Sequence, residues 1–483
     1  MTHKVYRVVD LETSINNTGP NAIGKNKASP YNPDNNIVMF GEKMVSDLGE
    51  ESTLIVDKTG GGALHKLTGA INTTLLVGHN FKFDMSYMYR DGAKIDVHPI
   101  RDWLADHYIW DTQVAEYILT GHDNTYPSLN ECADKYGGTL KDERLTIMWK
   151  AGVPTEEMMP EMLEEYLEAD LDNTDLVFKA QTELAKEEGQ LALIRAMNKA
   201  AVAYTEMEYN GMAVDTSLCE LLAIETRAEV RKYEEELRNE LPKELQGRED
   251  PFNPDSDYIV NFGSPQQMSQ LLFGGDFKYR VREKVGVLKN GKDKIKYVDK
   301  VYKDPLFTFE PKPEWRTKKY EVYKTGDDVL KDVQLNQAYK VIGASTFIEY
   351  VIRLRGADKE LSGYYVPIPK LVTAEGVLHQ NINNCATKTG RLSQSDPNLQ
   401  NVASGGESRV KELFISRFPD GVIIDADYKQ LEVIALAYLS QDPQLISDIE
   451  NGVDIHEVTH NKVRTLLNSA GVDKDSQRLM VKG

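Results

Sequence analysis

The stretch Val-Tyr-Arg-Val-Val-Asp-Leu-Glu, residues 5–12, sets the fold that we predict for the first part of the chain. Val5–Leu11 is apolar enough to form a short strand, and acidic residues lie at its end. A second apolar run, Thr73–Val77, also ends directly in polar residues. Apolar residues then recur at helical spacing in Trp110–Leu119 and in Glu161–Glu188. Strands that alternate with helices predict an α/β domain, and polar residues at strand ends predict that its active site lies there.

Length and composition indicate several domains and no membrane segment. The 483 residues exceed what a single hydrophobic core usually supports. Three cysteines lie far apart without a CxxC pair, so we expect neither a disulfide framework nor a thiolate zinc site. The N-terminus lacks the apolar stretch of a signal peptide, and no segment is apolar over the roughly 18 residues that span a bilayer. We therefore expect a cytoplasmic protein, in the host cytoplasm if it is viral, with no membrane partner.

The charge is distributed unevenly along the chain. A net charge of −19 argues against a protein that coats nucleic acid indiscriminately. Between Lys278 and Lys324, however, fifteen Lys or Arg residues occur with only seven Asp or Glu residues. Within this segment, Lys284–Leu288 and Lys294–Val298 alternate in polarity around Asn290-Gly291, a dipeptide that favours tight turns. The pattern predicts a lysine-rich β-hairpin, and a solvated loop is the alternative.

Three pairs of polar residues have the spacing of metal-binding or catalytic groups. Residues two apart on a strand point to one face, and residues four apart on a helix share one face. The strand pair is Asp10 with Glu12, and the helical pairs are Asn80 with Asp84 and Tyr166 with Asp170. Each pair by itself is a weak signal, because polar groups on one face are usually only a solvated surface.

In that order along the chain, the three pairs resemble the ribonuclease H-like exonuclease fold of proofreading domains and oligoribonucleases, in its tyrosine-containing (DEDDy) subclass. The resemblance implies two Mg²⁺ ions, with Mn²⁺ as an alternative, that hydrolyse a phosphodiester bond. The implied ligands are Asp10, Glu12, Asp84 and Asp170. It also implies that Tyr166 orients the attacking water and that Asn80 positions the terminal nucleotide. Asp111 is expected to support the site without binding metal.

Two further segments resemble family-A DNA polymerases. Met207–Asp215 is similar to the entry of the thumb in that family. The pattern of Asp215–Leu241, which follows it, predicts a long exposed helix or a hairpin arm. The sequence Asn-Cys-Ala-Thr-Lys-Thr-Gly-Arg-Leu-Ser-Gln-Ser-Asp-Pro-Asn-Leu-Gln-Asn, residues 384–401, is close to the family's TGRLSSxxPNLQN block. Its side chains can contact phosphates and minor-groove atoms near a primer terminus. The implied DNA-binding residues are Arg391, Asn398, Gln400 and Asn401.

The segment Asp425–Glu432 resembles the first catalytic motif of the same family. An apolar strand predicted at Gly421–Ala426 would deliver Asp427 as a catalytic metal ligand, and Glu432 would exclude a ribose 2′-hydroxyl. A strand that ends in a solvated turn is the alternative. Lys429 replaces the usual serine, and Val433-Ile434 replaces the usual Leu-Arg, so the polar network around the motif is in doubt. The cations and histidine implied for the incoming triphosphate are His456, Arg478 and Lys482.

The resemblance predicts four regions of a multidomain α/β protein with the layout of a right-hand polymerase. They are an exonuclease domain at 1–195, a thumb with the basic hairpin at 196–325, the first part of a palm at 326–445 and the start of the fingers at 446–483. The sequence stops at Gly483, before the family's stacking aromatic and second catalytic aspartate. We therefore expect a split or truncated gene whose C-terminal half is a separate chain. The compact size, the absence of an obvious 5′-nuclease domain and the insert-rich thumb favour a bacteriophage origin. A gene interrupted by an intron or an intein, or an incomplete sequence, would end in the same way.

The expected function is a DNA-directed DNA polymerase with 3′→5′ proofreading in DNA replication. Its expected partners are primer-template DNA, deoxynucleoside triphosphates, the missing half and a processivity factor. The alternative is an exonuclease that acts alone, with the polymerase remnant only binding DNA. A non-catalytic DNA-binding module would require a defect among the four carboxylates, and the sequence has none.

Overall fold

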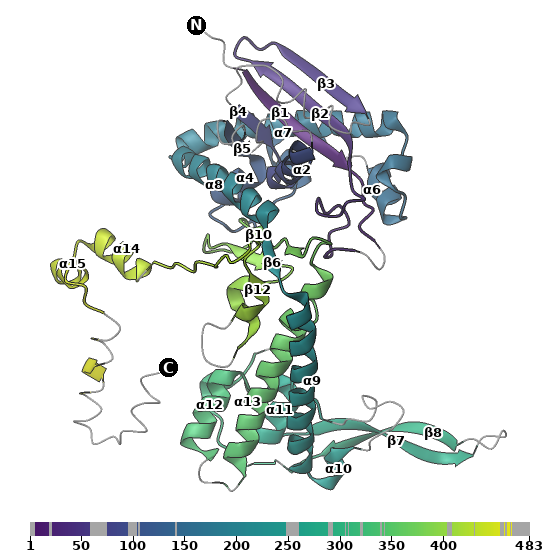
Figure 1. Cartoon of the computed structure of the whole chain (residues 1–483), viewed down its shortest axis with the longest axis vertical. Helices are drawn as coiled ribbons and strands as arrows, with labels where there is room; N and C mark the ends of the chain where they lie inside the picture. Colours follow the sequence, from purple (N-terminus) through teal and green to yellow (C-terminus); the bar gives the residue numbers. More distant parts are fainter. Residues whose placement is uncertain are drawn as a thin grey trace. The chain divides into compact units, whose positions relative to one another are not determined.

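The computed structural model describes residues 5–18, 22–57, 75–94, 104, 107–140, 143–247, 260–287, 293–304, 306–307, 309–318, 322–338, 341, 343–402, 408–428, 430–454, 458, 461–463 and 465. The chain forms two compact units, which we number unit 1 (Met1–Arg227 with Asp358–Gly421) and unit 2 (Ala228–Ala357 with Val422–Gly483). Figure 1 shows the elements in sequence colours. No helix in the described ranges is long and apolar enough to cross a membrane.

Unit 1 contains a mixed five-stranded sheet in the order β3-β2-β1-β4-β5. Its strands are β1 (Val5–Thr13), β2 (Ile37–Ser46), β3 (Glu51–Asp57), β4 (Leu75–Gly78) and β5 (Tyr108–Asp111). The pairs β1-β2 and β2-β3 are antiparallel, whereas β1-β4 and β4-β5 are parallel. The first two predicted strands are therefore confirmed as β1 and β4. The parallel strands β4 and β5 are connected through the helix Phe81–Lys94, which gives this unit the predicted α/β character.

Helices cover this sheet, as Figure 1 shows. They are α2 (Phe81–Lys94), α4 (Thr112–Leu119), α6 (Glu143–Lys150), α7 (Pro160–Glu187) and α8 (Leu191–Asn210), and α5 (Leu129–Tyr136) packs against α7 and α4. The helix predicted at Glu161–Glu188 is confirmed. The helix predicted from Trp110 is wrong at its start, because Trp110 belongs to β5 and the Asp111 side chain caps α4. The predicted domain boundary at residue 195 falls inside α8.

The remainder of unit 1 is built from short elements. A three-stranded sheet has the order β12-β6-β9, and β10 pairs with β11 in a hairpin. The strands are β6 (Met212–Val214), β9 (Val377–Leu378), β10 (Asn381–Asn383), β11 (Ser393–Ser395) and β12 (Phe414–Ile415). A small core that includes Val214, Tyr365 and Leu378 holds β6, β9 and β12 against short helical turns.

Unit 2 packs its helices around a separate apolar core that includes Leu237, Phe262 and Phe347. Its helices are α10 (Lys243–Gln246), α11 (Pro265–Phe273) and α12 (Asp327–Asn336), and the chain passes between the units through α9 (Thr216–Asn239) and α13 (Ala344–Glu360). The helix predicted at Asp215–Leu241 is confirmed as α9.

The predicted lysine-rich hairpin is confirmed and is longer than expected. Strands β7 (Phe277–Val287) and β8 (Asp293–Tyr302) pair antiparallel, with a register shift between Lys284 and Gly286. The Asn290-Gly291 turn lies outside the described residues. Phe277 is buried in the core of unit 2, whereas Tyr297 is exposed. The base of the hairpin is thus anchored, and farther along it Val285, Val287 and Tyr297 are exposed.

The strand predicted at Gly421–Ala426 is not formed. Residues 421–428 have no regular secondary structure and are exposed, and the chain then continues as α14 (Leu431–Ser440) and α15 (Pro443–Glu450). An apolar run becomes a strand only where a neighbouring strand takes its backbone hydrogen bonds. None of the described strands pairs with this run, so apolarity alone misled the prediction.

A glycine in β2 allows α7 to approach the sheet closely. A Cβ atom on Gly41 would lie 2.8 Å from Leu167 Cγ and 2.9 Å from Leu171 Cδ1, both on α7. Gly41 also pairs directly with Asp10 on β1. The missing side chain therefore lets the helix rest on the sheet beside the acidic end of β1.

We expect Gly41→Ala to lower the free energy of unfolding by about 1–3 kcal/mol, because the added methyl group overpacks the contact with α7. Urea unfolding followed by tryptophan fluorescence measures this change. Gly356→Ala is the matched control: its Cβ meets nothing within 4 Å, and alanine should stabilise α13 by about 0.5–1 kcal/mol. A Gly41→Ala variant as stable as the wild type would contradict the close packing of α7.

Candidate functional site

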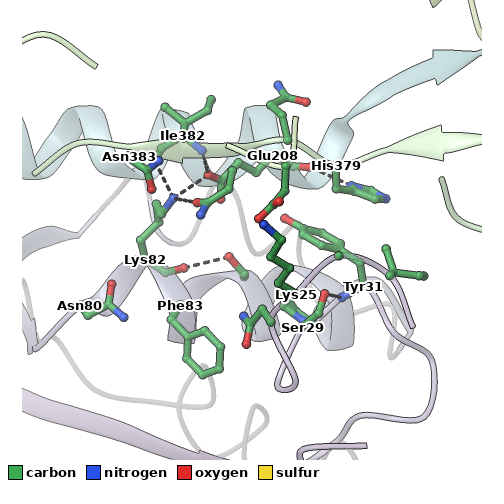
Figure 2. A pocket seen from close by; sticks show the side chains of 18 of the residues that line it. Lys25, Ser29, Tyr31, Asn80, Lys82, Phe83, Glu208, His379, Ile382 and Asn383 are labelled. Atoms are coloured by element: carbon green, nitrogen blue, oxygen red, sulfur yellow. Dashed lines mark hydrogen bonds and ion pairs between the residues drawn. The ribbon is translucent and has the colours of Figure 1, made fainter. Parts of the chain in front are cut away.

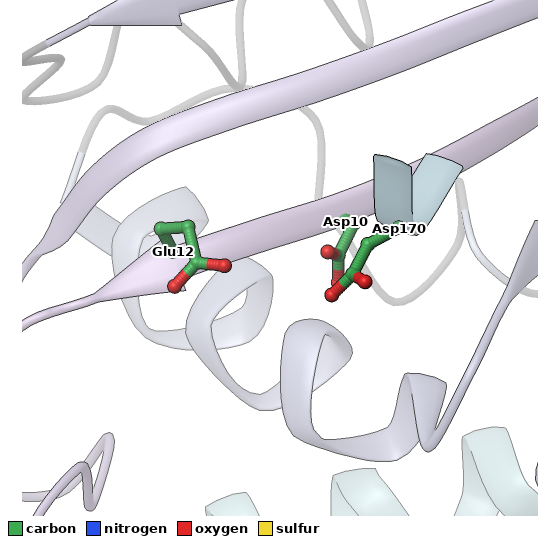
Figure 3. A group of neighbouring side chains, drawn as sticks. All are labelled: Asp10, Glu12 and Asp170. Atoms are coloured by element: carbon green, nitrogen blue, oxygen red, sulfur yellow. The ribbon is translucent and has the colours of Figure 1, made fainter. Parts of the chain in front are cut away.

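Three of the predicted carboxylates meet at the end of β1. Asp10 and Glu12 lie two residues apart on this strand, and Asp170 reaches them from α7 (Figure 3). One oxygen atom from each of the three lies within 4.8 Å of the other two. Like charges at this separation repel one another strongly in a buried site. A divalent cation bound between them would remove that repulsion.

Asp84 adds a fourth carboxylate from the first turn of α2. It is only 3% exposed. Burial raises the pKa of Asp84 well above its usual value, and the nearby charge of Asp10 raises it further. Its Oδ1 atom is buried and accepts no hydrogen bond within the described part of the chain. Carboxylate oxygens are the protein ligands that Mg²⁺ prefers, so this donor set fits the two ions that the sequence predicts.

Asp111 holds the start of α2 in place. Its Oδ1 accepts a hydrogen bond from the Asn80 backbone N–H and its Oδ2 accepts one from the Phe81 N–H, both at 2.9 Å. The same carboxylate caps α4 by accepting the N–H of Gln113. Burial raises the pKa of Asp111 to about 6. These contacts support the predicted scaffold role, because Asp111 fixes the turn that leads to Asp84.

Asn80 and Tyr166 occupy different settings. Asn80 precedes α2 with φ at 52°, a left-handed conformation that asparagine tolerates better than most residues. Asn80 lies outside the helix, so the prediction that Asn80 and Asp84 share one helical face is wrong. The Asp111 carboxylate accepts the backbone N–H of Asn80 just before the helix begins. Tyr166 lies on α7 one turn before Asp170, as predicted. Its ring contacts the Trp149 ring edge to face, with the two ring centroids 5.7 Å apart.

The residues implied for DNA binding also lie in unit 1. Asn398 caps the short 3₁₀ turn η6 (Leu399–Asn401) by accepting the Gln400 N–H at 3.1 Å. Asn398 and Asn401 line a cavity of about 490 Å³ together with Lys25, Lys359 and Lys370. Arg391 is exposed just before β11. The block thus offers amides beside three lysines, a setting suited to a phosphate backbone.

The residues implied for nucleotide binding are placed only in part. Asp427 and Glu432 belong to unit 2 and are exposed, with Glu432 in the first turn of α14. Neither joins a group of three metal-ligating side chains among the residues that the structure describes. The positions implied for the triphosphate, His456, Arg478 and Lys482, lie outside the described residues.

The sequence did not predict an ion pair between α2 and α8, in which Lys82 lies two residues before Asp84. Lys82 Nζ lies 2.5 Å from Glu208 Oε1 and also donates to Ile382 O at 2.6 Å (Figure 2). Glu208 Oε1 accepts the Ile382 backbone N–H as well. Burial raises the pKa of Glu208, and the charge of Lys82 opposes this. Lys82 lies between Asn80 and Asp84, and Glu208 lies in the segment Met207–Asp215, but nothing in the sequence shows that they meet.

The chain is similar to known polymerases. Residues 231–482 match the model of the family described as DNA polymerase family A. DNA polymerase I of Bacillus subtilis (strain 168) is 28% identical over 367 residues, which are 72% of this chain and 33% of that protein. The thermostable DNA polymerase I of Thermus filiformis is 40% identical over 120 residues, 24% of this chain and 14% of that protein. The chain spans about a third, or less, of the length of these curated relatives.

One solved structure resembles almost the whole chain. It is the POL domain of Pol1 from M. smegmatis in complex with DNA primer-template and dNTP. The TM-score is 0.62 at 19% identity, and the match covers 99% of this chain and 66% of that one. At this identity the likeness concerns the fold, and it agrees with the mixed α/β architecture predicted from the sequence.

We expect Asp84→Asn to raise the unfolding temperature in EDTA, because it removes a buried charge that Asp10 repels. Magnesium should raise the unfolding temperature of the wild type and have a smaller effect on the variant, since ligand binding stabilises the folded state. Thermal unfolding with EDTA and with Mg²⁺ measures both effects. Glu168→Gln, on the exposed side of α7, should behave as the wild type. Equal stabilisation of both proteins by Mg²⁺ would exclude Asp84 as a ligand.

Proposed function

The chain belongs to DNA polymerase family A, and on that premise we propose that it acts on the 3′ end of primer DNA, as a DNA-directed DNA polymerase with a 3′→5′ proofreading exonuclease. The observation that carries the exonuclease is the meeting of Asp10, Glu12 and Asp170 within 4.8 Å. The buried Asp84 beside them supports it. The ribonuclease H-like character of unit 1 is part of this proposal.

In the proposed exonuclease, Asp10, Glu12, Asp84 and Asp170 hold two divalent cations. Bound there, Mg²⁺ ions lower the pKa of a water molecule and stabilise the charge on the leaving 3′ oxygen. Tyr166 orients that water from the turn of α7 that precedes Asp170. Asn80 lies where α2 begins and positions the terminal nucleotide. Asp111 keeps that turn fixed, so the geometry is ready before the strand arrives.

We propose primer-template DNA and deoxynucleoside triphosphates as substrates of the polymerase function. The similar Pol1 domain is described in complex with both. Arg391, Asn398, Gln400 and Asn401 would contact the primer end, and Asp427 would hold a catalytic metal. Glu432 would exclude nucleotides that carry a ribose 2′-hydroxyl.

A stand-alone exonuclease is the second candidate. Nucleotidyl transfer with two metals needs another carboxylate beside Asp427. The three grouped carboxylates of the described residues, Asp10, Glu12 and Asp170, all belong to the proposed exonuclease. In this second candidate the chain only shortens DNA, and its polymerase-like part binds the duplex.

A labelled primer separates the two candidates. We expect a 5′-labelled primer annealed to a template to shorten in Mg²⁺, and Asp10→Ala/Glu12→Ala to slow this more than about a hundredfold. Changes to the outer-shell partners of a metal alone cost about 10–100-fold, and this variant removes two ligands. Glu164→Ala/Glu168→Ala, both exposed on α7, is the matched control and should cut at the wild-type rate. Unchanged cutting by the double ligand variant would refute the exonuclease assignment.

The four deoxynucleoside triphosphates form the other arm of that assay. Extension of the primer supports the polymerase function, and loss of extension in Asp427→Ala would assign it to the proposed metal ligand. Shortening without extension supports the stand-alone exonuclease.

The hairpin β7-β8 is proposed to bind duplex phosphates. Its exposed cations include Lys278, Lys296 and Lys300. Arg280 is paired with Asp299 at 2.7 Å, so it is left unchanged in the variant that tests this role. Each phosphate contact releases counterions and steepens the fall of affinity with salt. Docking of a processivity factor is the alternative role.

Replacing these three lysines by glutamine should reduce the slope of log affinity against log salt by roughly one per lost contact. Fluorescence anisotropy of a labelled duplex at several salt concentrations measures the slope. Lys331→Gln, exposed on α12 of the same unit, controls for a general loss of charge. If the slope stays that of the wild type, the hairpin does not bind phosphates, and the docking role becomes the better explanation.

A further inference from the structure

A buried lysine joins α7 to the sheet of unit 1. Lys43 lies on β2 and is only 7% exposed. Its Nζ atom lies 2.9 Å from Asp172 Oδ1 and 3.2 Å from Asp175 Oδ2, both on α7. The same atom lies 3.1 Å from Glu51 Oε2 on β3. One side chain thus connects two strands of the sheet with the helix that carries Asp170.

Asp175 also receives a contact from β1. The Tyr6 hydroxyl donates to Asp175 Oδ1 at 2.5 Å, and Lys179, one turn farther along α7, pairs with Asp175 Oδ2 at 2.9 Å. Asp175 is 3% exposed. Burial acts to raise the pKa of this carboxyl group, but its hydrogen bonds to Tyr6, Lys179 and Lys43 outweigh burial and lower the pKa. The carboxyl group is therefore ionised at neutral pH, and its contact with Lys43 is an ion pair.

These contacts act where apolar packing restrains the helix least. Gly41 and Lys43 are two residues apart on β2, so they point to the face of the sheet that α7 covers. The leucines of α7 next to Gly41 limit how closely the helix approaches. Apolar contact has no preferred direction, whereas charged hydrogen bonds have a defined geometry. Lys43 therefore restrains sliding of α7 along the strand more tightly than the leucines do.

The carboxylate site depends on where α7 lies along the sheet. Asp10 and Glu12 share β1, which fixes their spacing, whereas Asp170 reaches them from α7. A metal site has to be held within about 0.5 Å of its productive geometry. The two aspartates bound by Lys43 belong to the part of α7 that directly follows Asp170.

We propose that Lys43 is a positioning residue for Asp170 and acts on it through the following turn of α7. The inference rests on the proposed exonuclease, because it concerns the divalent cations of that site. Without Lys43, α7 occupies the position that suits the cations for only part of the time. The apparent affinity for the cations then falls by that fraction, and a saturating concentration restores the site because binding selects the competent position.

The charge of Lys43 by itself predicts the opposite effect. A positive charge near the carboxylates opposes the binding of divalent cations. If charge alone mattered, removing Lys43 would make these cations bind more tightly. The direction of the change in affinity therefore separates positioning from a simple charge effect.

The test replaces Lys43 by methionine, which has a similar length and no charge. The signal of free Mn²⁺ in electron paramagnetic resonance measures binding, and Asp10→Ala/Glu12→Ala defines the part that belongs to the carboxylate site. We expect the Kd for Mn²⁺ to rise about tenfold in Lys43→Met, the lower end of the 10–100-fold that outer-shell partners of a metal cost. The Mg²⁺ concentration for half-maximal cutting should rise likewise, while the rate at saturating Mg²⁺ stays near that of the wild type.

Arg7→Met is the matched control. Arg7 lies on β1 and is 1% exposed, and its Nε atom lies 3.0 Å from Glu42 Oε1. Glu42 is next to Lys43 along β2, so the pair with Arg7 lies on the sheet face opposite α7. Losing this buried cation should lower the unfolding temperature and leave the Kd for Mn²⁺ unchanged.

Asp172→Asn tests the same contact from the helix without removing a buried group. The Asp172 side chain is 61% exposed, so the variant should fold as the wild type. We expect its Kd for Mn²⁺ to rise by less than that of Lys43→Met, because Asp175 still holds the lysine.

Two results would overturn the proposal. One is unchanged or tighter Mn²⁺ binding by Lys43→Met and Asp172→Asn. The other is an equal loss of affinity in Arg7→Met, because a general loss of stability would then explain the effect.

Cutting of a labelled primer separates this inference from the proposed function. If the wild type shortens the primer and Lys43→Met needs no more Mg²⁺ than the wild type, the positioning role fails and the exonuclease stands. If the wild type cuts no DNA but Mn²⁺ binding at the carboxylates depends on Lys43, the exonuclease fails and the positioning role is supported. A wild type that binds no Mn²⁺ at these carboxylates overturns both.

Discussion

The close approach of α7 to the sheet at Gly41 is the constraint on which the carboxylate site depends. Asp10 and Glu12 come from β1, whereas Asp170 comes from α7. Gly41 pairs with Asp10, and a Cβ atom there would overlap Leu167 and Leu171. The helix can therefore bring its carboxylate to within metal-binding distance of the strand only because this residue has no side chain.

A second buried contact joins distant parts of unit 1. Glu208 at the end of α8 accepts from Lys82 on α2 and from the backbone of Ile382 on β10. Burying two charges is costly, and additional hydrogen bonds offset part of this cost, because each partner also bonds to a backbone group of Ile382. The same contact forms one wall of a cavity that Asn80 also lines. The ion pair therefore joins α2, α8 and β10 and also lines this cavity.

The buried carboxylates of Asp111 and Asp84 differ in their hydrogen bonding. Asp111 is satisfied by backbone N–H groups and fixes local structure. Asp84 keeps a buried oxygen without a hydrogen bond in the described part of the chain, at a cost to stability. Groups left unsatisfied in this way are typical of functional sites, where stability is given up for chemistry. By this contrast Asp111 supports the local structure, and Asp84 is the better candidate for the proposed metal ligand.

The sequence by itself determined the elements whose signal is local: β1, β4, α7, α9, the basic hairpin and the spacing of Asp10, Glu12 and Asp170. The sequence did not predict correctly those segments whose conformation depends on pairing with another strand. Trp110 became a strand residue because β4 pairs with it, and Gly421–Ala426 stayed irregular because none of the described strands does. Only the tertiary structure brought Lys82 to Glu208 and Lys43 to α7. Periodicity follows from the chain's own geometry, whereas burial and partnership depend on residues far away in sequence, and a single sequence does not record which of these meet.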